Sequence, residues 1–383
     1  MARPAIDHGP DGGHLVHGMG LTLEAPAWPA ITVAEAQAVL ARFPAAGPLV
    51  ALHWHSPRPF SAAALVETGA GAFILKRHHQ HVRTPATLAP EHRFMAHLRA
   101  AGLPVPDIVA ADTGASAIGQ DAWTYELHRT GAGLDLYRDR HSWTPFLHHG
   151  HAHAAGVALG RMHLAAQGFN APDRGPQPLI ASFTILPSPD PLAAAEAYVA
   201  ARPALGAFLA DKPWRRDLAR LLGALGDGLP ARLAQAPRLW THNDWHPSNL
   251  LWSTDGAVSA VFDFGLATQT CALHDLATAI ERTAIPWLQL RESRADDAGA
   301  LALLGGYRTV MPLTGDDIAT LARLLPLVHV EFALSEVDYF AGILGDTAQA
   351  LIAWQDYCLG HAEWFLSPQG RDFVQRLQAG ATA

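Results

Sequence analysis

The sequence has little cysteine and no long apolar run. Cys271 and Cys358 are the only cysteines among 383 residues, they lie far apart, and they form no CxxC pair. The sequence therefore predicts neither a disulfide framework nor a zinc site, and we expect both side chains to be buried as small apolar groups. No stretch offers the roughly 18 consecutive apolar residues of a membrane span, and the N-terminus lacks the apolar core of a signal peptide. We expect a cytoplasmic protein with no membrane partner.

Positive charge is also scarce. The chain holds 27 basic and 35 acidic residues, which gives a formal net charge of −8. This balance argues against a protein that binds nucleic acid by broad phosphate neutralisation. Hydrophobic residues make up 49% of the chain and charged residues 16%, which is typical of a globular protein rather than a disordered one. The length suits two domains, or one unit built of two lobes.

Local patterns predict an extension followed by strands. Residues 1–30 are rich in Gly, Pro and His without a sustained period, which indicates a loosely attached extension. A capping box from Thr32 to Glu35 predicts a helix that runs to about Phe43. Strand-like runs between Leu49 and Lys76, with a Gly-Ala-Gly turn at residues 69–71, predict antiparallel strands.

A helix and a last strand complete the predicted N-terminal lobe, residues 31–128. The helix is expected to start near Pro90 and to end at Gly102, with an apolar face of Phe94, Met95, Leu98 and Ala101. The run AWTYELH predicts the next strand, and the lobe boundary is expected between Leu127 and Gly133. The rest, residues 129–383, is mostly helical text and predicts a larger C-terminal lobe.

The segments RLWTHNDWHPSNLLW and AVSAVFDFGLA carry the pattern most typical of a chemical site. His242, Asp244 and Asn249 stand in an H-x-D-x-x-x-x-N spacing, and Asp263 follows within VFDFG. Phosphoryl transfer needs a carboxylate that orients and deprotonates the attacking hydroxyl, and oxygen ligands for the metal ions on the phosphates. A predicted hairpin around Asp255-Gly256 brings the asparagine and the second aspartate together. The alternative is that these residues only decorate a turn between strands.

The pattern resembles the catalytic and metal-binding motifs of the aminoglycoside phosphotransferase and choline kinase superfamily, distant relatives of protein kinases. The resemblance implies that Asp244 is the catalytic base, that Asn249 and Asp263 bind Mg²⁺, and that His242 is a structural member of the loop. The sequence Asp275-Leu276-Ala277 resembles the D-L-A of these kinases, and no A-P-E segment follows. The run LGRMHLAAQGF resembles homoserine kinases of the aminoglycoside phosphotransferase type.

Upstream, the resemblance extends to the nucleotide site. Lys76, at the end of the run GAFILK, resembles the lysine that contacts the ATP phosphates. Glu91 is the only acidic residue between Lys76 and Asp107, so it is the expected ion-pair partner of the lysine, placed in the first helical turn. The alternative for both is an ordinary surface charge.

Two further parts of the nucleotide site are less defined. The turn expected to cover the phosphates, Ser56 to Ser61, contains no glycine, which leaves backbone amides or Ser61 as candidate phosphate contacts. By the resemblance, the adenine lies against the main chain near Tyr125, Glu126 and Leu127. The alternative for Glu126 is an exposed charge on an edge strand.

Other polar and aromatic groups have competing interpretations. The histidine tracts at 78–81 and 148–153 favour solvent-exposed segments over a metal site. Glu331 and Asp338, together with Glu336, are candidate acceptor-binding carboxylates, although a solvated helix face is the favoured interpretation. The late aromatic residues are expected in a helix core; they are Tyr339, Phe340, Trp354, Tyr357, Trp364 and Phe365.

Together these patterns predict an α+β, protein-kinase-like bilobal fold with a small antiparallel N-lobe. The implied function is an ATP- and Mg²⁺-dependent phosphotransferase that acts on a small-molecule hydroxyl, as in an amino alcohol or a hydroxy amino acid such as homoserine. One alternative is a kinase that inactivates an amino-sugar or peptide-like antibiotic. The other is a nucleotide-binding pseudokinase, which the glycine-free turn suggests and the intact motif residues disfavour. No nucleic-acid partner is expected.

Overall fold

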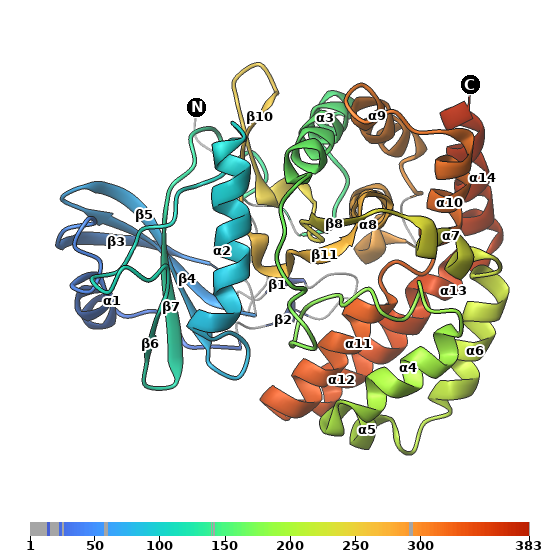
Figure 1. Cartoon of the computed structure of the whole chain (residues 1–383), viewed down its shortest axis with the longest axis horizontal. Helices are drawn as coiled ribbons and strands as arrows, with labels where there is room; N and C mark the ends of the chain where they lie inside the picture. The colour runs from blue at the N-terminus through green and yellow to red at the C-terminus, as the bar shows by residue number, and fades with distance from the viewer. Residues whose placement is uncertain are drawn as a thin grey trace.

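The computed structural model describes residues 14–15, 23–24, 27–56, 60–138, 140, 142–290 and 294–382. Within these ranges the chain forms a sheet-based N-terminal lobe and a mostly helical C-terminal lobe, side by side in Figure 1. No helix in this part of the chain has the length and apolar character to cross a membrane. Most of the predicted extension lies outside the described residues; in it β1 (His14–Leu15) pairs with β2 (Leu23–Glu24).

A five-stranded antiparallel sheet forms the N-terminal lobe, in the order β3-β4-β5-β7-β6. The strands are β3 (Leu49–His55), β4 (Ala62–Thr68), β5 (Gly71–His79), β6 (Ile118–Gln120) and β7 (Trp123–Arg129). The predicted turn at 69–71 therefore joins β4 to β5, and Gly71, at φ 118°, takes a backbone conformation that favours glycine. Lys76 lies inside β5 rather than at its end, because the strand continues to His79.

Two helices accompany the sheet. The predicted capping box is confirmed: Thr32 caps α1 (Val33–Leu40) and Glu35 reaches back to it. The second helix, α2 (Pro85–Ala100), begins five residues earlier than predicted, because Thr84 caps it and Pro85 occupies its first turn. Glu91 therefore lies in the second turn of α2, not the first.

The described residues form two hydrophobic cores, and α2 belongs to the larger one. One core fills the space between α1 and the sheet, with Phe73 and Leu127 at its centre. The other is larger and occupies the helical lobe, and Phe94, Met95 and Leu98 of α2 belong to it. Ala101, predicted on the same face, caps the helix and is exposed. As Figure 1 shows, α2 stands between the sheet and the helical lobe.

The C-terminal lobe consists of helices around two short antiparallel ribbons. The ribbons are β8 (Arg238–Thr241) with β11 (Thr268–Cys271), and β9 (Leu250–Trp252) with β10 (Val258–Val261). The helices are α3 (His149–Ala166), α4 (Pro191–Ala200), α5 (Pro203–Leu209), α6 (Trp214–Leu225), α7 (Leu229–Gln235), α8 (Ala272–Ala284), α9 (Asp297–Arg308), α10 (Gly315–Leu324), α11 (Val330–Asp338), α12 (Thr347–Ile352), α13 (Gly360–Leu366) and α14 (Pro368–Thr382). Two π-helical segments, η4 (Tyr339–Leu344) and η5 (Ala353–Leu359), join the last helices.

Helices α3 and α9 pack with their backbones in contact. A Cβ atom on Gly156 would lie 1.9 Å from the Leu303 carbonyl oxygen, and one on Gly306 would lie 2.0 Å from the His153 carbonyl oxygen. Only glycine permits this approach at both positions. The contact fixes α3, which carries His163 toward Asp275 and the loop after β8.

Several predictions for this lobe are confirmed. Cys271 and Cys358 are free and buried. The late aromatic residues pack in the large core, with Trp364 partly exposed at its margin. The division of the chain at residue 128 into two separate units stays a prediction.

Candidate active site

The loop after β8 is shaped by the first aspartate of the D-L-A sequence. Asp275, in the first turn of α8, accepts the backbone N–H of His242 and of Asn243 at 2.8 Å each. His163 of α3 holds the same carboxylate at 3.0 Å. Asn243 adopts φ 59°, a left-handed conformation that asparagine tolerates better than most residues. The resemblance to the D-L-A sequence pointed to Asp275 without a role, and the structure shows that Asp275 anchors the loop after β8.

The imidazole of His242 is buried and fully bonded. Its Nδ1 accepts the backbone N–H of Asp244 at 3.2 Å, so Nε2 carries the proton and donates to the Phe262 carbonyl oxygen at 3.0 Å. The ring thus joins the two halves of the motif. This arrangement supports the predicted structural role of His242.

Asp244, Asn249 and Asp263 converge as predicted. The amide nitrogen of Asn249 donates to the Asp244 carbonyl oxygen at 2.9 Å and to its carboxylate at 3.0 Å. The hairpin β9–β10 turns at Asp255-Gly256, and beyond it the Phe262 N–H donates to the Asn249 carbonyl oxygen at 3.1 Å. Asp263 follows in a left-handed conformation, φ 60° and ψ 63°, a strained geometry that is common at functional sites.

Lys76 reaches Asp263 from the other lobe. Its ammonium donates to Asp263 Oδ1 at 2.8 Å. Burial opposes both charges, yet the pair raises the pKa of Lys76 and lowers the pKa of Asp263 from their ordinary values. The Asp263 side chain remains 40% exposed, so its carboxylate faces the space between the lobes.

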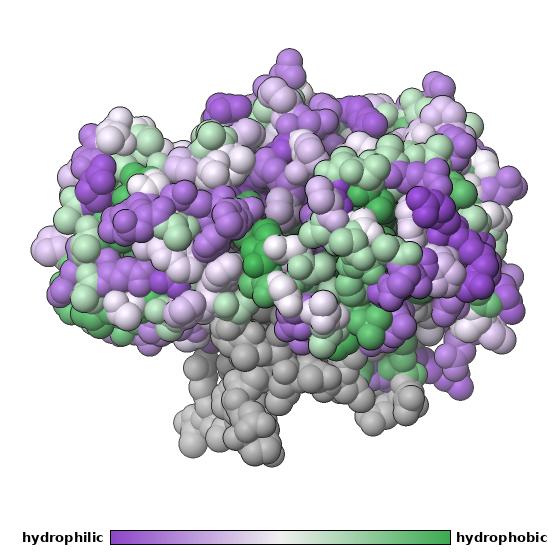
Figure 2. Space-filling view, turned by 90° about the horizontal axis from the view of Figure 1, so that it is seen from below, coloured by the Kyte–Doolittle hydropathy of each residue, from purple (hydrophilic) through white to green (hydrophobic). Residues whose placement is uncertain are grey.

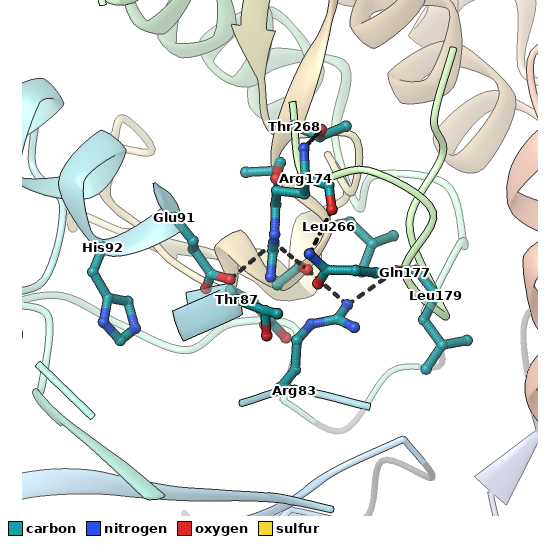
Figure 3. A network of polar contacts seen from close by, with 12 residues as sticks. Arg83, Thr87, Glu91, His92, Arg174, Gln177, Leu179, Leu266 and Thr268 are labelled. Carbon is teal, nitrogen blue, oxygen red and sulfur yellow. Dashed lines mark hydrogen bonds and ion pairs between the residues drawn. The ribbon is translucent and has the colours of Figure 1, made fainter. Parts of the chain in front are cut away.

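The predicted ion pair between Lys76 and Glu91 is wrong. Glu91 pairs instead with Arg174, in the connection before α4, at 3.0 Å, and both side chains are at most 1% exposed. The guanidinium of Arg174 also donates to the carbonyl oxygens of Gly265 at 2.9 Å and Ala267 at 3.2 Å. Figure 3 shows Glu91 pointing from α2 to Arg174, with Arg83 beside it; Arg83 donates to the Gly265 carbonyl oxygen at 3.1 Å. Glu91 of α2 is therefore linked through Arg174 to the loop that follows Asp263, and Arg83, just before the helix, bonds to the same loop.

Arg282 of α8 was not predicted as a site residue. Its guanidinium forms an ion pair with the Asp244 carboxylate and lies over the rings of Trp143, at 4.4 Å, and Phe332, at 5.2 Å. Burial alone would raise the pKa of Asp244, but Arg282 and His246 hold it well below its ordinary value. The sequence signal was available: Arg282 lies seven residues after Asp275, on the same face of α8.

The glycine-free turn is described in part, since residues 57–59 lie outside the described ranges. Ser61 immediately precedes β4, and its contact with phosphate stays a prediction. Phe60 reaches across to the helical lobe, where its ring meets Tyr339 at 5.4 Å and Phe340 at 6.0 Å. In Figure 2 apolar residues gather near the middle of the lower face, where the two lobes meet.

The expected adenine contacts at Tyr125, Glu126 and Leu127 need correction. All three lie inside β7, which is paired with β5 on one side and with β6 and the Ile108 segment on the other. The Leu127 carbonyl oxygen already accepts the Val109 N–H at 2.8 Å. The Leu127 side chain lies in the small core and the Tyr125 hydroxyl donates to Glu35. Strand pairing and these contacts therefore occupy the β7 main chain that was expected to meet the adenine.

Glu126 is not an exposed charge on an edge strand. Its side chain is fully buried, because β7 is an inner strand and α2 covers it. His78, His92 and His128 surround its carboxylate. Burial opposes ionisation, yet these histidines hold the pKa of Glu126 well below its ordinary value.

The candidate acceptor carboxylates do not form a solvated helix face, so that interpretation is wrong. Glu331 is buried and accepts the N–H groups of Thr184, at 2.9 Å, and Ile185, at 2.6 Å. Glu336 is also buried. Asp338 is partly buried and accepts the Leu205 N–H at 3.3 Å. Because protein groups occupy Glu331 and Asp338, the structure gives neither an evident acceptor contact.

The two histidine tracts differ. His148, His149 and His153 are exposed, as predicted. In the first tract His81 is exposed, but His78 is buried, since alternate residues of β5 face α2.

Comparison with known proteins agrees with the site. Residues 58–313 match the phosphotransferase enzyme family. A homoserine kinase of Gluconacetobacter diazotrophicus is 30% identical over 196 residues, which are 49% of this chain and 52% of that protein. The chain spans about half the length of the curated relatives it matches.

Solved structures share the fold at low identity. A microcompartment-associated aminopropanol kinase superposes with a TM-score of 0.55 and 20% identity, over 88% of this chain and 99% of that one. An amicoumacin kinase bound to AMP-PNP, Ca²⁺ and its antibiotic gives 0.53 and 15%, over 86% and 88%. With the matched residues covering more than half of its length, the chain belongs to the phosphotransferase enzyme family and has its protein-kinase-like bilobal fold.

Proposed function

We propose that this chain transfers the γ-phosphoryl group of ATP to an alcohol hydroxyl of a small molecule, an amino alcohol or a hydroxy amino acid such as homoserine. The observation that carries the proposal is the meeting of Asp244, Asn249, Asp263 and Lys76 at one place between the lobes. A carboxylate for the acceptor hydroxyl, oxygen ligands for a metal and a cation for phosphate are the groups that phosphoryl transfer requires.

The donor set suits Mg²⁺, which prefers carboxylate and amide oxygens. The side-chain nitrogen of Asn249 donates both of its hydrogen bonds to Asp244. The side-chain oxygen of Asn249 is therefore the atom that can bind a metal. Asp263 supplies a partly exposed carboxylate. Held by Asn249 and Asp263, Mg²⁺ would reduce the negative charge of the ATP phosphates.

The protein residues then have distinct roles in the proposed reaction. Asp244 accepts a hydrogen bond from the acceptor hydroxyl and orients the hydroxyl oxygen toward the γ-phosphorus. It takes the hydroxyl proton as the new P–O bond forms and the bond from the γ-phosphorus to the ADP oxygen breaks. Because Arg282 lowers the pKa of Asp244, the carboxylate is a weak base, and its main contribution is orientation. Lys76 moves from Asp263 to the phosphate oxygens when nucleotide enters.

The choice of acceptor rests on the relatives. The curated matches are homoserine kinases and one structural neighbour is an aminopropanol kinase, and both names denote small acceptors that carry an amine and a hydroxyl. The amicoumacin kinase supports an antibiotic acceptor as the second candidate. A pseudokinase is disfavoured, because the residues of the motif are present and in contact.

The test is acceptor-stimulated release of ADP by the wild type and by Asp244→Asn, with MgATP and a panel of amino alcohols, hydroxy amino acids, sugars and aminoglycosides. The asparagine variant should bind nucleotide with unchanged affinity and lose about 10²- to 10⁴-fold in kcat. Asp255→Asn is the matched control, since Asp255 is exposed at the tip of the same hairpin, and it should keep full activity.

The outcome identifies the function. Stimulation by homoserine or an amino alcohol supports the proposal, and stimulation by an aminoglycoside or a peptide antibiotic replaces its acceptor. Full activity of Asp244→Asn, or no release with any acceptor while nucleotide still binds, would contradict the assignment of this site.

A further inference from the structure

A second polar cluster lies inside the N-terminal lobe, between the sheet and α2. Lys76 and Glu126 are direct cross-strand partners, so both face the same side of the sheet. His78 and His128 follow two residues later on β5 and β7, and alternation places them on that side too. α2 covers this face and contributes His92, which in Figure 3 points away from the Arg174 network.

The ring nitrogens of the three histidines converge on the Glu126 carboxylate. His92 Nε2 lies 2.5 Å from Oε2 and His128 Nε2 lies 3.0 Å from the same oxygen. His78 Nε2 lies 3.0 Å from Oε1. For His92, Glu126 and His128, one ligand atom from each lies within 4.8 Å of the other two. His78 is not part of that group, because it lies on the other carboxylate oxygen. The group of three therefore offers two nitrogens and one oxygen around one point.

This donor set and its size suit a zinc ion. Zinc binds imidazole nitrogen and carboxylate oxygen in tetrahedral sites with bonds of about 2.0–2.2 Å, so its ligand atoms lie roughly 3.4 Å apart. The nitrogen–oxygen distances of 2.5 Å for His92 and 3.0 Å for His128 are somewhat shorter, and side-chain movements of about half an ångström would open the group to that spacing. The three side chains are 1–11% exposed, so the ion would be enclosed.

The surroundings of His92 also fit a metal ligand. Its other ring nitrogen, Nδ1, lies 2.7 Å from the Ser116 hydroxyl. Metal-bound histidines commonly donate this second N–H to an oxygen, which fixes the ring orientation. The hydroxyl can accept that bond as readily as it donates one.

A second group of this kind, Glu281 with His329 and His361, is a poorer candidate. Arg282 follows Glu281 directly, and its charge acts on both Glu281 and His329. Cations act on the first cluster as well, because Lys76 and Arg174 lie near Glu126. What distinguishes the second cluster is that burial raises the pKa of Glu281 to about 7, which makes its carboxyl group a weaker metal ligand.

We propose that His92, Glu126 and His128 bind one Zn²⁺ ion that fastens α2 to the sheet, with a water molecule as the fourth ligand. His78 stays bonded to the other oxygen of Glu126. The prediction of no zinc site considered the two cysteines and the histidine tracts at 78–81 and 148–153, and His92 and His128 belong to neither group. The site is separate from the proposed Mg²⁺ ligands. It does not depend on the proposed activity.

The experiment uses the full chain without an affinity tag, so that no added histidines bind metal. Protein stripped with a chelator is titrated with Zn²⁺ and with Co²⁺. Zinc content after gel filtration, the melting temperature and the visible spectrum of the Co²⁺ form are measured. The variants are Glu126→Gln, which keeps the shape of the side chain, Glu281→Gln, and His53→Ala as the matched control. His53 forms an exposed His–Glu pair with Glu67.

The wild type, His53→Ala and Glu281→Gln should each retain one tight zinc, melt at a higher temperature with Zn²⁺ than with Mg²⁺, and give the strong visible bands of tetrahedral Co²⁺. Glu126→Gln should bind at least about tenfold more weakly. The wild-type measurements decide the question even if Glu126→Gln fails to fold. Wild type that retains no zinc and shows no tetrahedral Co²⁺ spectrum would show that the cluster is a hydrogen-bond network only. Binding lost in Glu281→Gln, or unchanged in Glu126→Gln, would also overturn the assignment.

Discussion

The buried pair of Glu91 and Arg174 should be one of the more sensitive points of the fold. Glu91→Gln keeps the volume of the side chain but removes the negative charge that compensates Arg174, which is completely enclosed. Removing one partner of a buried ion pair typically costs about 3–5 kcal/mol, because the remaining charge is left in a low-dielectric site. We expect a loss of stability of that size.

The effect should extend to nucleotide binding. Arg174 also donates to the carbonyl oxygens of Gly265 and Ala267, which follow Asp263 in the chain. A guanidinium without its carboxylate will shift toward water and pull on this loop. Affinity for the magnesium–nucleotide complex should therefore fall together with stability.

Urea unfolding followed by fluorescence measures the first effect, and calorimetric titration with magnesium–ADP measures the second. Asp112→Asn is the matched control, since Asp112 forms a two-bond ion pair with Arg42 at the exposed surface, where pairs contribute little. If Glu91→Gln unfolds at the same urea concentration as Asp112→Asn, the ion pair of Glu91 and Arg174 does not fasten α2 to the loop that follows Asp263.

Three further predictions follow from the charges of the site. Asp263→Asn should raise the Mg²⁺ concentration needed for half-maximal rate and lower kcat, because it removes both a metal ligand and the partner of Lys76; an unchanged Mg²⁺ titration would count against its role. Arg282→Met should move the acidic limb of the kcat/KM pH profile to higher pH. In the wild type the depressed pKa of Asp244 keeps its carboxylate ionised at pH values below the ordinary pKa of an aspartate. Identical acidic limbs in the two proteins would show that Arg282 does not control the ionisation of Asp244. Burial raises the pKa of Glu281 from 4.5 to about 7, so between these pH values the folded state holds a proton that the unfolded state has lost. The free energy of unfolding should therefore fall as the pH rises from 4.5 to about 7. Urea titrations at several pH values should show a smaller fall for Glu281→Gln than for the wild type.

The sequence predicted those parts of the site that are local in the chain. The catalytic loop and its hairpin span Thr241 to Asp263, the turn has an Asp-Gly pair, and strand pairing brings the Asn249 and Phe262 backbones together. The fold class followed from similarly local signals, such as the capping box at Thr32. In each case the residues that contact one another are also the residues that form the recognisable sequence motif.

The partner of Glu91 could not be found in this way. Lys76 was the natural choice, because a strand lysine and a helix glutamate pair in related kinases. Arg174 lies in a Pro-rich connection without periodicity, and only the packing of α2 on the helical lobe brings it near. The interpretation of Glu126 as an exposed charge was wrong for a similar reason. Alternation along β7 identifies a polar face of the strand, but it does not show that α2 covers that face.

One long-range contact was nevertheless encoded in a readable pattern. Asp275 and Arg282 are separated by two turns of α8, so both side chains face the loop after β8. Asp275 holds the loop backbone at His242 and Asn243, while Arg282 holds the side chain of Asp244. The same helix thus determines where the loop lies and how basic its carboxylate is. Since Asp244 is a weak base in this setting, we infer that the site depends on exact placement of the acceptor hydroxyl, which makes acceptor fit, more than proton affinity, the determinant of rate.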